Sequence, residues 1–158
     1  MRSSIGVLLA VLISPLAQAE LLDEVNDRGE LRIAVLADAA PYAFKDGEHM
    51  TGFDVELGQA LARELDLRPA FIEVPAEEVM AGVQSGLYDV ALDEQSVPAQ
   101  AELDTSEPYS TAERVIPFQK DNPAFKSAVN NALQRLKDAG QLAELEARWL
   151  KPEATAAQ

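Results

Sequence analysis

Two adjacent acids, Asp93 and Glu94, directly follow segment 88–92, whose apolar character is typical of a buried strand. In open α/β sheets, ligands bind outside the carboxyl ends of parallel strands. These carboxylates could therefore meet a cation, an amine or a basic partner. Solvated charge on a loop is the alternative, because the chain is rich in acids. A metal site is less favoured, since calcium takes about 6–8 oxygen ligands and adjacent strand residues point to opposite faces.

Two tyrosines are further candidates for a binding site, because each lies at a turn next to a proline. Tyr42 follows Pro41 and Tyr109 follows Pro108, so both rings could line the rim of a cleft. Packing is an equally good interpretation of both. His49 is the one histidine and is expected to be a solvated loop residue. One histidine and no cysteine provide neither a transition-metal site nor a Ser-His-Asp site, so the sequence indicates no enzyme and no cofactor.

The charge balance limits the classes of molecule that the chain is expected to bind. Its 158 residues include 13 Lys and Arg but 27 Asp and Glu, which gives a formal net charge of −14. Without a basic run, binding to nucleic acid or to an anionic membrane surface is disfavoured. The absence of cysteine excludes disulfides and thiol chemistry. A hydrophobic share of 47% and a charged share of 25% are typical of one folded domain.

Residues 1–19 have the pattern of a secretory signal peptide. Arg2 precedes an apolar run over 5–13, and the segment ends in the small-x-small motif Ala17-Gln18-Ala19. A membrane anchor is the alternative, but the run is shorter than the roughly 20 residues that span a bilayer. We expect cleavage after Ala19 and a soluble periplasmic product.

The rest of the chain alternates between short strands and helices, so that positions 93 and 94 fall at the end of the third strand. Two successive β-α-β units predict a parallel sheet with right-handed crossovers. Asp54 is expected to cap the second helix, and Asp121-Asn122 to cap the fourth. The polar tail 151–158 is expected to be flexible. The expected helices are 21–28, 54–66, 76–85, 123–139 and one after Gly140, and the expected extended segments are 31–36, 70–74, 88–92 and 114–118.

Several short motifs resemble, in their order and spacing, the bacterial family 3 extracellular solute-binding proteins. They are GELRI at 29–33, PYAF at 41–44, GFDVEL at 52–57, SGLYDV at 85–90, SEPY at 106–109 and the C-terminal part from 121 to 149. The resemblance covers nearly all of 20–150. It implies a periplasmic-binding-protein clamshell of two lobes that captures amino acids or other small polar solutes for an ABC importer.

The chain departs from this family by lacking room for a second lobe. In the family, the chain crosses to the second lobe after the Pro-Tyr turn and returns to the terminal helices. Here only 119–121 separate Phe118 from the helix that begins at 123, whereas a domain takes at least about 50 residues. The predicted fold class is therefore α/β: a single periplasmic-binding-protein-like lobe over 20–150, with parallel-sheet β-α-β units closed by two C-terminal helices.

A second departure concerns the residues that recognise amino acids in the family. Ala39-Ala40 and Pro75-Ala76 stand where the resemblance implies aromatic rings. After the third strand only Ser96 fits the family pattern, and Ala101 stands near the place of an arginine that would hold the solute carboxylate in a bidentate contact. We therefore expect that free α-amino acids are not bound in the usual family way. The candidate ligand-binding residues are Tyr42, Asp93, Glu94, Ser96 and Tyr109.

Two functions follow from these expectations. The first is a reduced substrate-binding component linked to an ABC-type importer, whose partners would be a small polar or cationic solute, a membrane permease and a possible second copy. Glu77 and Glu78, near the acids at 93–94, favour a cationic ligand. The alternative is an interaction or accessory module, for example for a periplasmic quinoprotein dehydrogenase, that has lost solute binding.

Overall fold

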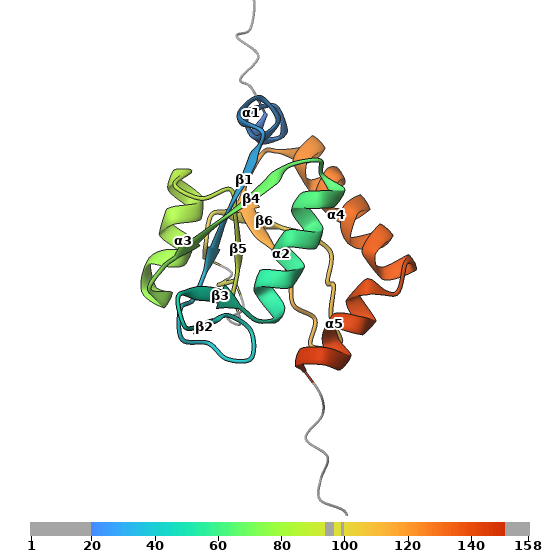
Figure 1. Ribbon diagram of the computed structural model, residues 1–158. Helices are drawn as coiled ribbons and strands as arrows, with labels where there is room; N and C mark the ends of the chain where they lie inside the picture. The colour runs from blue at the N-terminus through green and yellow to red at the C-terminus, as the bar shows by residue number, and fades with distance from the viewer. Residues whose placement is uncertain (1–19, 94–96, 99, 151–158) are drawn as a thin grey trace, which may run out of the picture.

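The computed structural model describes residues 20–93, 97–98 and 100–150. The expected signal peptide, its cleavage site after Ala19 and the tail 151–158 lie outside the described residues. The described part is a parallel sheet with helix α3 on one face and helices α2, α4 and α5 on the other (Figure 1). None of its helices has the length and apolar character needed to cross a bilayer.

The central strand is β1 (Glu30–Val35), which lies between β4 (Arg68–Glu73) and β5 (Val90–Leu92). Both pairings are parallel, and Ile33 is in register with Phe71 on one side and Val90 on the other. Helix α2 (Phe53–Glu64) lies on the path from β1 to β4, and helix α3 (Ala76–Ser85) connects β4 to β5. The predicted parallel sheet of β-α-β units is therefore confirmed.

Alternation along β1 divides the interior into two apolar clusters, because successive strand residues face opposite sides of a sheet. Ile33 and Val35 join the larger cluster with α2 and the C-terminal helices, whereas Ala34 joins a smaller cluster beneath α3. Helix α2 lies close to the sheet at Gly58, where an added Cβ would be 2.7 Å from the ring of Phe71. The helix therefore needs a glycine at this contact.

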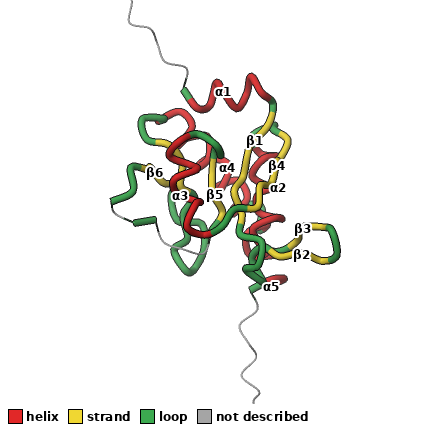
Figure 2. Tube along the Cα trace, turned by 90° about the vertical axis from the view of Figure 1, so that its left-hand side faces the viewer, coloured by secondary structure: helices red, strands yellow, loops and turns green. Residues whose placement is uncertain are grey.

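The remaining elements close the lobe. Helix α1 lies across the end of the molecule opposite the β2–β3 hairpin (Figure 2). Strands β6 and β7 pair antiparallel, and α4 and α5 pack against α2. The two C-terminal helices were predicted. The hairpin was not, because each of its strands has three residues. The elements are α1 (Leu21–Arg28), β2 (Phe44–Asp46), β3 (His49–Thr51), β6 (Leu103–Thr105), β7 (Pro117–Gln119), α4 (Pro123–Asp138) and α5 (Gln141–Trp149).

The expected cap at Asp54 is wrong. Gly52 occupies the N-cap position with a φ of 122°, and an added Cβ there would be 2.3 Å from the carbonyl oxygen of Tyr42. Asp54 lies inside the helix, where its N–H donates to that same carbonyl at 2.7 Å. The close approach of two backbones selects glycine at the cap and leaves the Asp54 carboxylate for another partner.

The start of α4 also differs from the prediction, although Pro123 does open the helix. Asn122 occupies the N-cap position without a side-chain cap, and the Glu20 carboxylate instead accepts hydrogen bonds from the N–H groups of Ala124 and Phe125. In return, the Asn122 side-chain oxygen accepts the N–H of Leu21 at 2.8 Å. The first described residues thus cap a helix a hundred positions away.

Candidate functional site

A hollow of about 450 Å³ lies at the carboxyl edge of the sheet, where β1 and β4 end and α3 begins. We call it the carboxyl-edge hollow; it is lined by residues 36–39 and 73–76. Open α/β sheets bind ligands at this edge. Its charged side chains are Asp38 and Glu73, and no basic residue is among the eight that line it. Lys45 approaches from β2 and forms an exposed ion pair with Glu73 at 2.9 Å.

Three of the five predicted site residues lie close together on a neighbouring part of this edge. Tyr42 and Tyr109 both lie against the guanidinium of Arg114, and Asp93 contributes to the electrostatic field at Tyr109. The other two, Glu94 and Ser96, lie outside the described residues.

Asp93 is buried, with only 6% of its surface exposed. The interpretation of this residue as solvated loop charge is therefore wrong. Strand β5 ends at Leu92, and the side chain of the next residue, Asp93, is buried in the protein interior at this edge of the sheet.

Arg114 is the centre of the cluster and was missed by sequence reasoning. Its Nη1 and Nη2 donate to the two Asp54 carboxylate oxygens at 3.0 and 3.3 Å. The side chains are only 7% and 3% exposed. The guanidinium carbon lies 4.3 Å from the ring centre of Tyr42, and the rings of Phe53 and Tyr109 follow at 5.8 and 5.9 Å. A carboxylate and three aromatic rings therefore surround one cation.

Burial dominates the electrostatics of this cluster. It raises the pKa of the Tyr109 phenol well above its ordinary value, against the opposing effect of the Arg114 charge. Burial alone would lower the pKa of Arg114, but Tyr109 and Asp54 outweigh it and the net shift is upward. Arg114 therefore stays charged and Tyr109 stays a neutral phenol. Both tyrosines pack around the chain's own arginine, and Tyr109 is buried whereas Tyr42 is half-buried.

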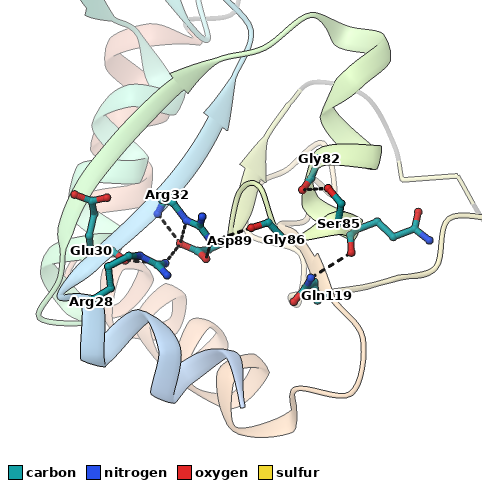
Figure 3. A network of polar contacts seen from close by, with 9 residues as sticks. Arg28, Glu30, Arg32, Gly82, Ser85, Gly86, Asp89 and Gln119 are labelled. Atoms are coloured by element: carbon teal, nitrogen blue, oxygen red, sulfur yellow. Dashed lines mark hydrogen bonds and ion pairs between the residues drawn. The ribbon is translucent and has the colours of Figure 1, made fainter. Parts of the chain in front are cut away.

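A second polar network lies at the opposite edge of the sheet (Figure 3). The Asp89 carboxylate, fully shielded from solvent, accepts hydrogen bonds from Arg28 at 2.5 Å and from Arg32 at 2.9 Å. It also accepts the backbone N–H of Arg32 at 2.7 Å, and Arg32 donates to the carbonyl of Gly86 at 3.0 Å. The hydrogen bond to Asp89 raises the pKa of Arg32. This network joins α1, β1 and the start of β5.

His49 is exposed, as expected, but lies in β3 rather than in a loop. Within the described ranges, no group of three or more His, Cys, Asp or Glu residues is arranged to hold a metal ion.

Comparison with known proteins identifies relatives of this architecture. The family model of the bacterial extracellular solute-binding proteins, family 3, matches residues 31–152. The L-cystine-binding protein TcyA of Bacillus subtilis is 28% identical over 111 residues, which are 68% of this chain and 41% of that protein. The cyclohexadienyl dehydratase of Pseudomonas aeruginosa is 30% identical over 87 residues, 53% of this chain and 32% of the enzyme. The chain thus spans less than half the length of these relatives.

A solved structure of an isolated lobe is also similar. The arginine-bound form of domain 1 from TmArgBP superimposes with a TM-score of 0.67 at 23% identity, and the match covers 72% of this chain and 98% of that domain. The described fold is therefore that of one lobe of a periplasmic binding protein.

Proposed function

Because the chain belongs to the bacterial extracellular solute-binding proteins of family 3, we propose that it is a one-lobed periplasmic solute-binding protein. It binds a small polar or cationic solute in the carboxyl-edge hollow and serves an ABC-type importer. It does not bind free α-amino acids in the way that the family resemblance implies.

The observation that carries the proposal is the carboxyl-edge hollow itself. A volume of about 450 Å³ suits a solute of the size of an amino acid or a diamine. Asp38 and Glu73 are its charged groups, and the ion pair with Lys45 offsets part of the negative charge of Glu73. The remaining field favours a cation and disfavours an anion.

The small side chains of the hollow argue against the family's amino-acid mode. Ala39 and Ala76 line it at or beside the positions where the resemblance implies aromatic rings. Ala101, near the place of the implied arginine, is half-buried and packs against the smaller apolar cluster. An α-carboxylate would therefore lack a bidentate partner at this edge.

A single lobe leaves one side of the solute in water. Domain 1 of TmArgBP is described in an arginine-bound form, which supports solute binding by one lobe. Ligand pockets commonly bury about 70–90% of a ligand, so we expect this open hollow to bind more weakly than a closed clamshell. A permease or a second copy would then supply the missing wall.

One observation favours the alternative of an interaction module. Tyr42 and Tyr109 pack around Arg114, and the ring of Tyr109 is buried by these contacts. A lobe whose aromatic side chains surround its own arginine could present the same edge to a protein partner, for example a periplasmic quinoprotein dehydrogenase.

Thermal unfolding of the exported chain in a solute panel separates these functions. The panel contains diamines, arginine, sugars, dicarboxylates and calcium. A solute at a hundred times its Kd adds about 2.7 kcal/mol to the free energy of unfolding. We expect stabilisation by diamines, and its loss in the Asp38→Asn/Glu73→Gln variant. The Asp27→Asn/Glu144→Gln variant, which removes two exposed acids elsewhere, should keep it. A flat response across the panel would favour the interaction module.

Export has its own test. We expect the mature protein to begin at Glu20, and the role of Glu20 as the cap of α4 supports a defined N-terminus there. Mass spectrometry of the secreted protein measures this directly, and a retained Met1 with membrane association would contradict it.

A further inference from the structure

A second hollow, of about 420 Å³, lies at the amino edge of the sheet, away from the proposed solute site. We call it the amino-edge hollow. It forms where α2 ends and β4 begins, and it adjoins the residue that terminates α1. Its lining residues are Gly29, Gln59, Arg63, Asp66, Leu67, Arg68 and Pro69.

The two arginines of this hollow differ from most basic residues of the chain. Seven of the eleven Lys and Arg side chains in the described ranges form ion pairs with carboxylates. Arg63 and Arg68 form none, although acids outnumber bases by about two to one. The other two unpaired cations, Lys120 and Lys137, lie elsewhere and do not line this hollow.

Neither arginine is needed to complete the backbone of α2. The last four carbonyl groups of the helix already accept hydrogen bonds: Leu61 from Leu65, Ala62 from Leu65 and Leu67, Arg63 from Asp66, and Glu64 from the Arg135 side chain. The end of the helix is therefore satisfied. Both guanidinium groups remain free to bind something outside the chain.

The groups in the hollow share a donor character. Two guanidinium groups and the Gln59 amide offer N–H donors, and Asp66 is the one acid among the lining residues. The local charge is positive in a chain whose formal net charge is −14. A planar guanidinium matches the oxygens of a phosphate or carboxylate group in a bidentate contact.

We propose that the amino-edge hollow binds a small oxyanion, a phosphate or a carboxylate group, through Arg63 and Arg68. Both side chains are exposed, so the contact is screened by salt and is strongest at low ionic strength. The site is independent of the proposed solute function, because the two hollows lie at opposite edges of the sheet.

The test is a titration of the exported chain with inorganic phosphate, and separately with malonate, followed by amide NMR at low ionic strength. We expect saturable shifts at residues 59–69 and at Gly29. The Arg63→Gln/Arg68→Gln variant should bind at least about tenfold more weakly. The matched Lys120→Gln/Lys137→Gln variant removes the same charge and should bind as the unchanged protein does. Equal losses in the two variants, or shifts spread over the whole surface, would overturn the proposal.

Sedimentation with phosphatidic-acid vesicles distinguishes a free oxyanion from a lipid headgroup. The net charge of the chain predicts no co-sedimentation, since an acidic protein is repelled by an anionic membrane. Binding to vesicles without any response to free phosphate or malonate would contradict the proposed site.

Discussion

The two edges of the sheet each bury an aspartate against arginine, but with different exposure of the cation. At the carboxyl edge, the Arg114 side chain is 7% exposed and meets Asp54. At the amino edge, Arg28 and Arg32 are 31% and 28% exposed and share Asp89. Removing the cation of a buried ion pair leaves a buried charge uncompensated. When the removed cation is partly exposed, water and the second arginine replace part of the stabilisation that it gave to the carboxylate. We therefore expect the same pair of residue types to stabilise the carboxyl edge strongly and the amino edge modestly.

The position of Arg114 gives this difference a role in the architecture. Arg114 lies in the segment between β6 and β7, and its partner Asp54 lies on α2. Tyr42 stacks on the guanidinium and follows closely after Asp38 and Ala39, which line the carboxyl-edge hollow. One buried cation thus holds the segment between β6 and β7 against α2, beside the proposed solute site.

The largest effect is expected for Arg114→Met. The variant removes the guanidinium that pairs with the buried Asp54 carboxylate, and breaking a buried ion pair typically lowers the free energy of unfolding by about 3–5 kcal/mol. Urea unfolding measures the change. If Arg114→Met does not fold, the Asp54→Leu/Arg114→Met variant removes both charges and should recover much of the loss. A loss below about 1 kcal/mol in the single variant would mean that the pair behaves as a surface contact.

A smaller effect is expected for Arg28→Gln at the other edge. Asp89 keeps its contacts with the side chain and the backbone N–H of Arg32, so the loss should be about 1 kcal/mol. Because Arg28 is partly exposed, high salt should already weaken its pair with Asp89 and shrink the difference between variant and unchanged protein. The loss of unfolding free energy in Arg114→Met should not change with the salt concentration, because that ion pair is buried. If the stability losses of Arg28→Gln and Arg114→Met depended equally on salt, the two edges would not differ in the way proposed.

The smallest effect concerns the half-exposed ion pair of Asp104 and Lys126, which lies at neither edge cluster and serves as a reference for both. Burial alone would raise the pKa of Asp104, but the hydrogen bonds from Lys126 and from the Thr105 N–H outweigh it and lower the pKa. A lowered pKa in the folded state stabilises the protein above the ordinary carboxyl range, and this contribution is lost as the pH falls through the folded pKa. In Lys126→Gln, NMR titration should find the Asp104 pKa raised; an unchanged value would refute the assignment of the shift to Lys126.

Local pattern was enough to predict much of the fold. The helices over 21–28 and 76–85 have the predicted bounds, because their apolar spacing and their terminal glycines at 29 and 86 are local signals. The parallel sheet followed from the alternation of strands and helices. The hairpin of β2 and β3 was missed because its strands are too short to show a period.

The candidate site was less predictable, because its contacts join distant parts of the chain. Asp54 has the sequence context of a helix cap, but its partner Arg114 is 60 positions away, and no local pattern connects them. Tyr42 and Tyr109 were singled out as candidate ligand-binding residues, and the structure places both rings beside that same arginine. Asp93 directly follows a strand, and only the packing of the edge decides whether such a residue faces water or the interior.

Calorimetric titration of the exported chain with cadaverine and with glutarate tests whether the carboxyl-edge hollow binds a cationic solute. The two solutes have matched carbon chains and opposite end charges, so they isolate the effect of the carboxylates in the carboxyl-edge hollow. We expect cadaverine to bind and glutarate not to bind in this hollow. The Asp38→Asn/Glu73→Gln variant should lose the cadaverine signal, whereas the Asp27→Asn/Glu144→Gln variant should keep it. Glutarate binding that survives the Arg63→Gln/Arg68→Gln substitutions, or cadaverine binding unaffected by Asp38→Asn/Glu73→Gln, would contradict it.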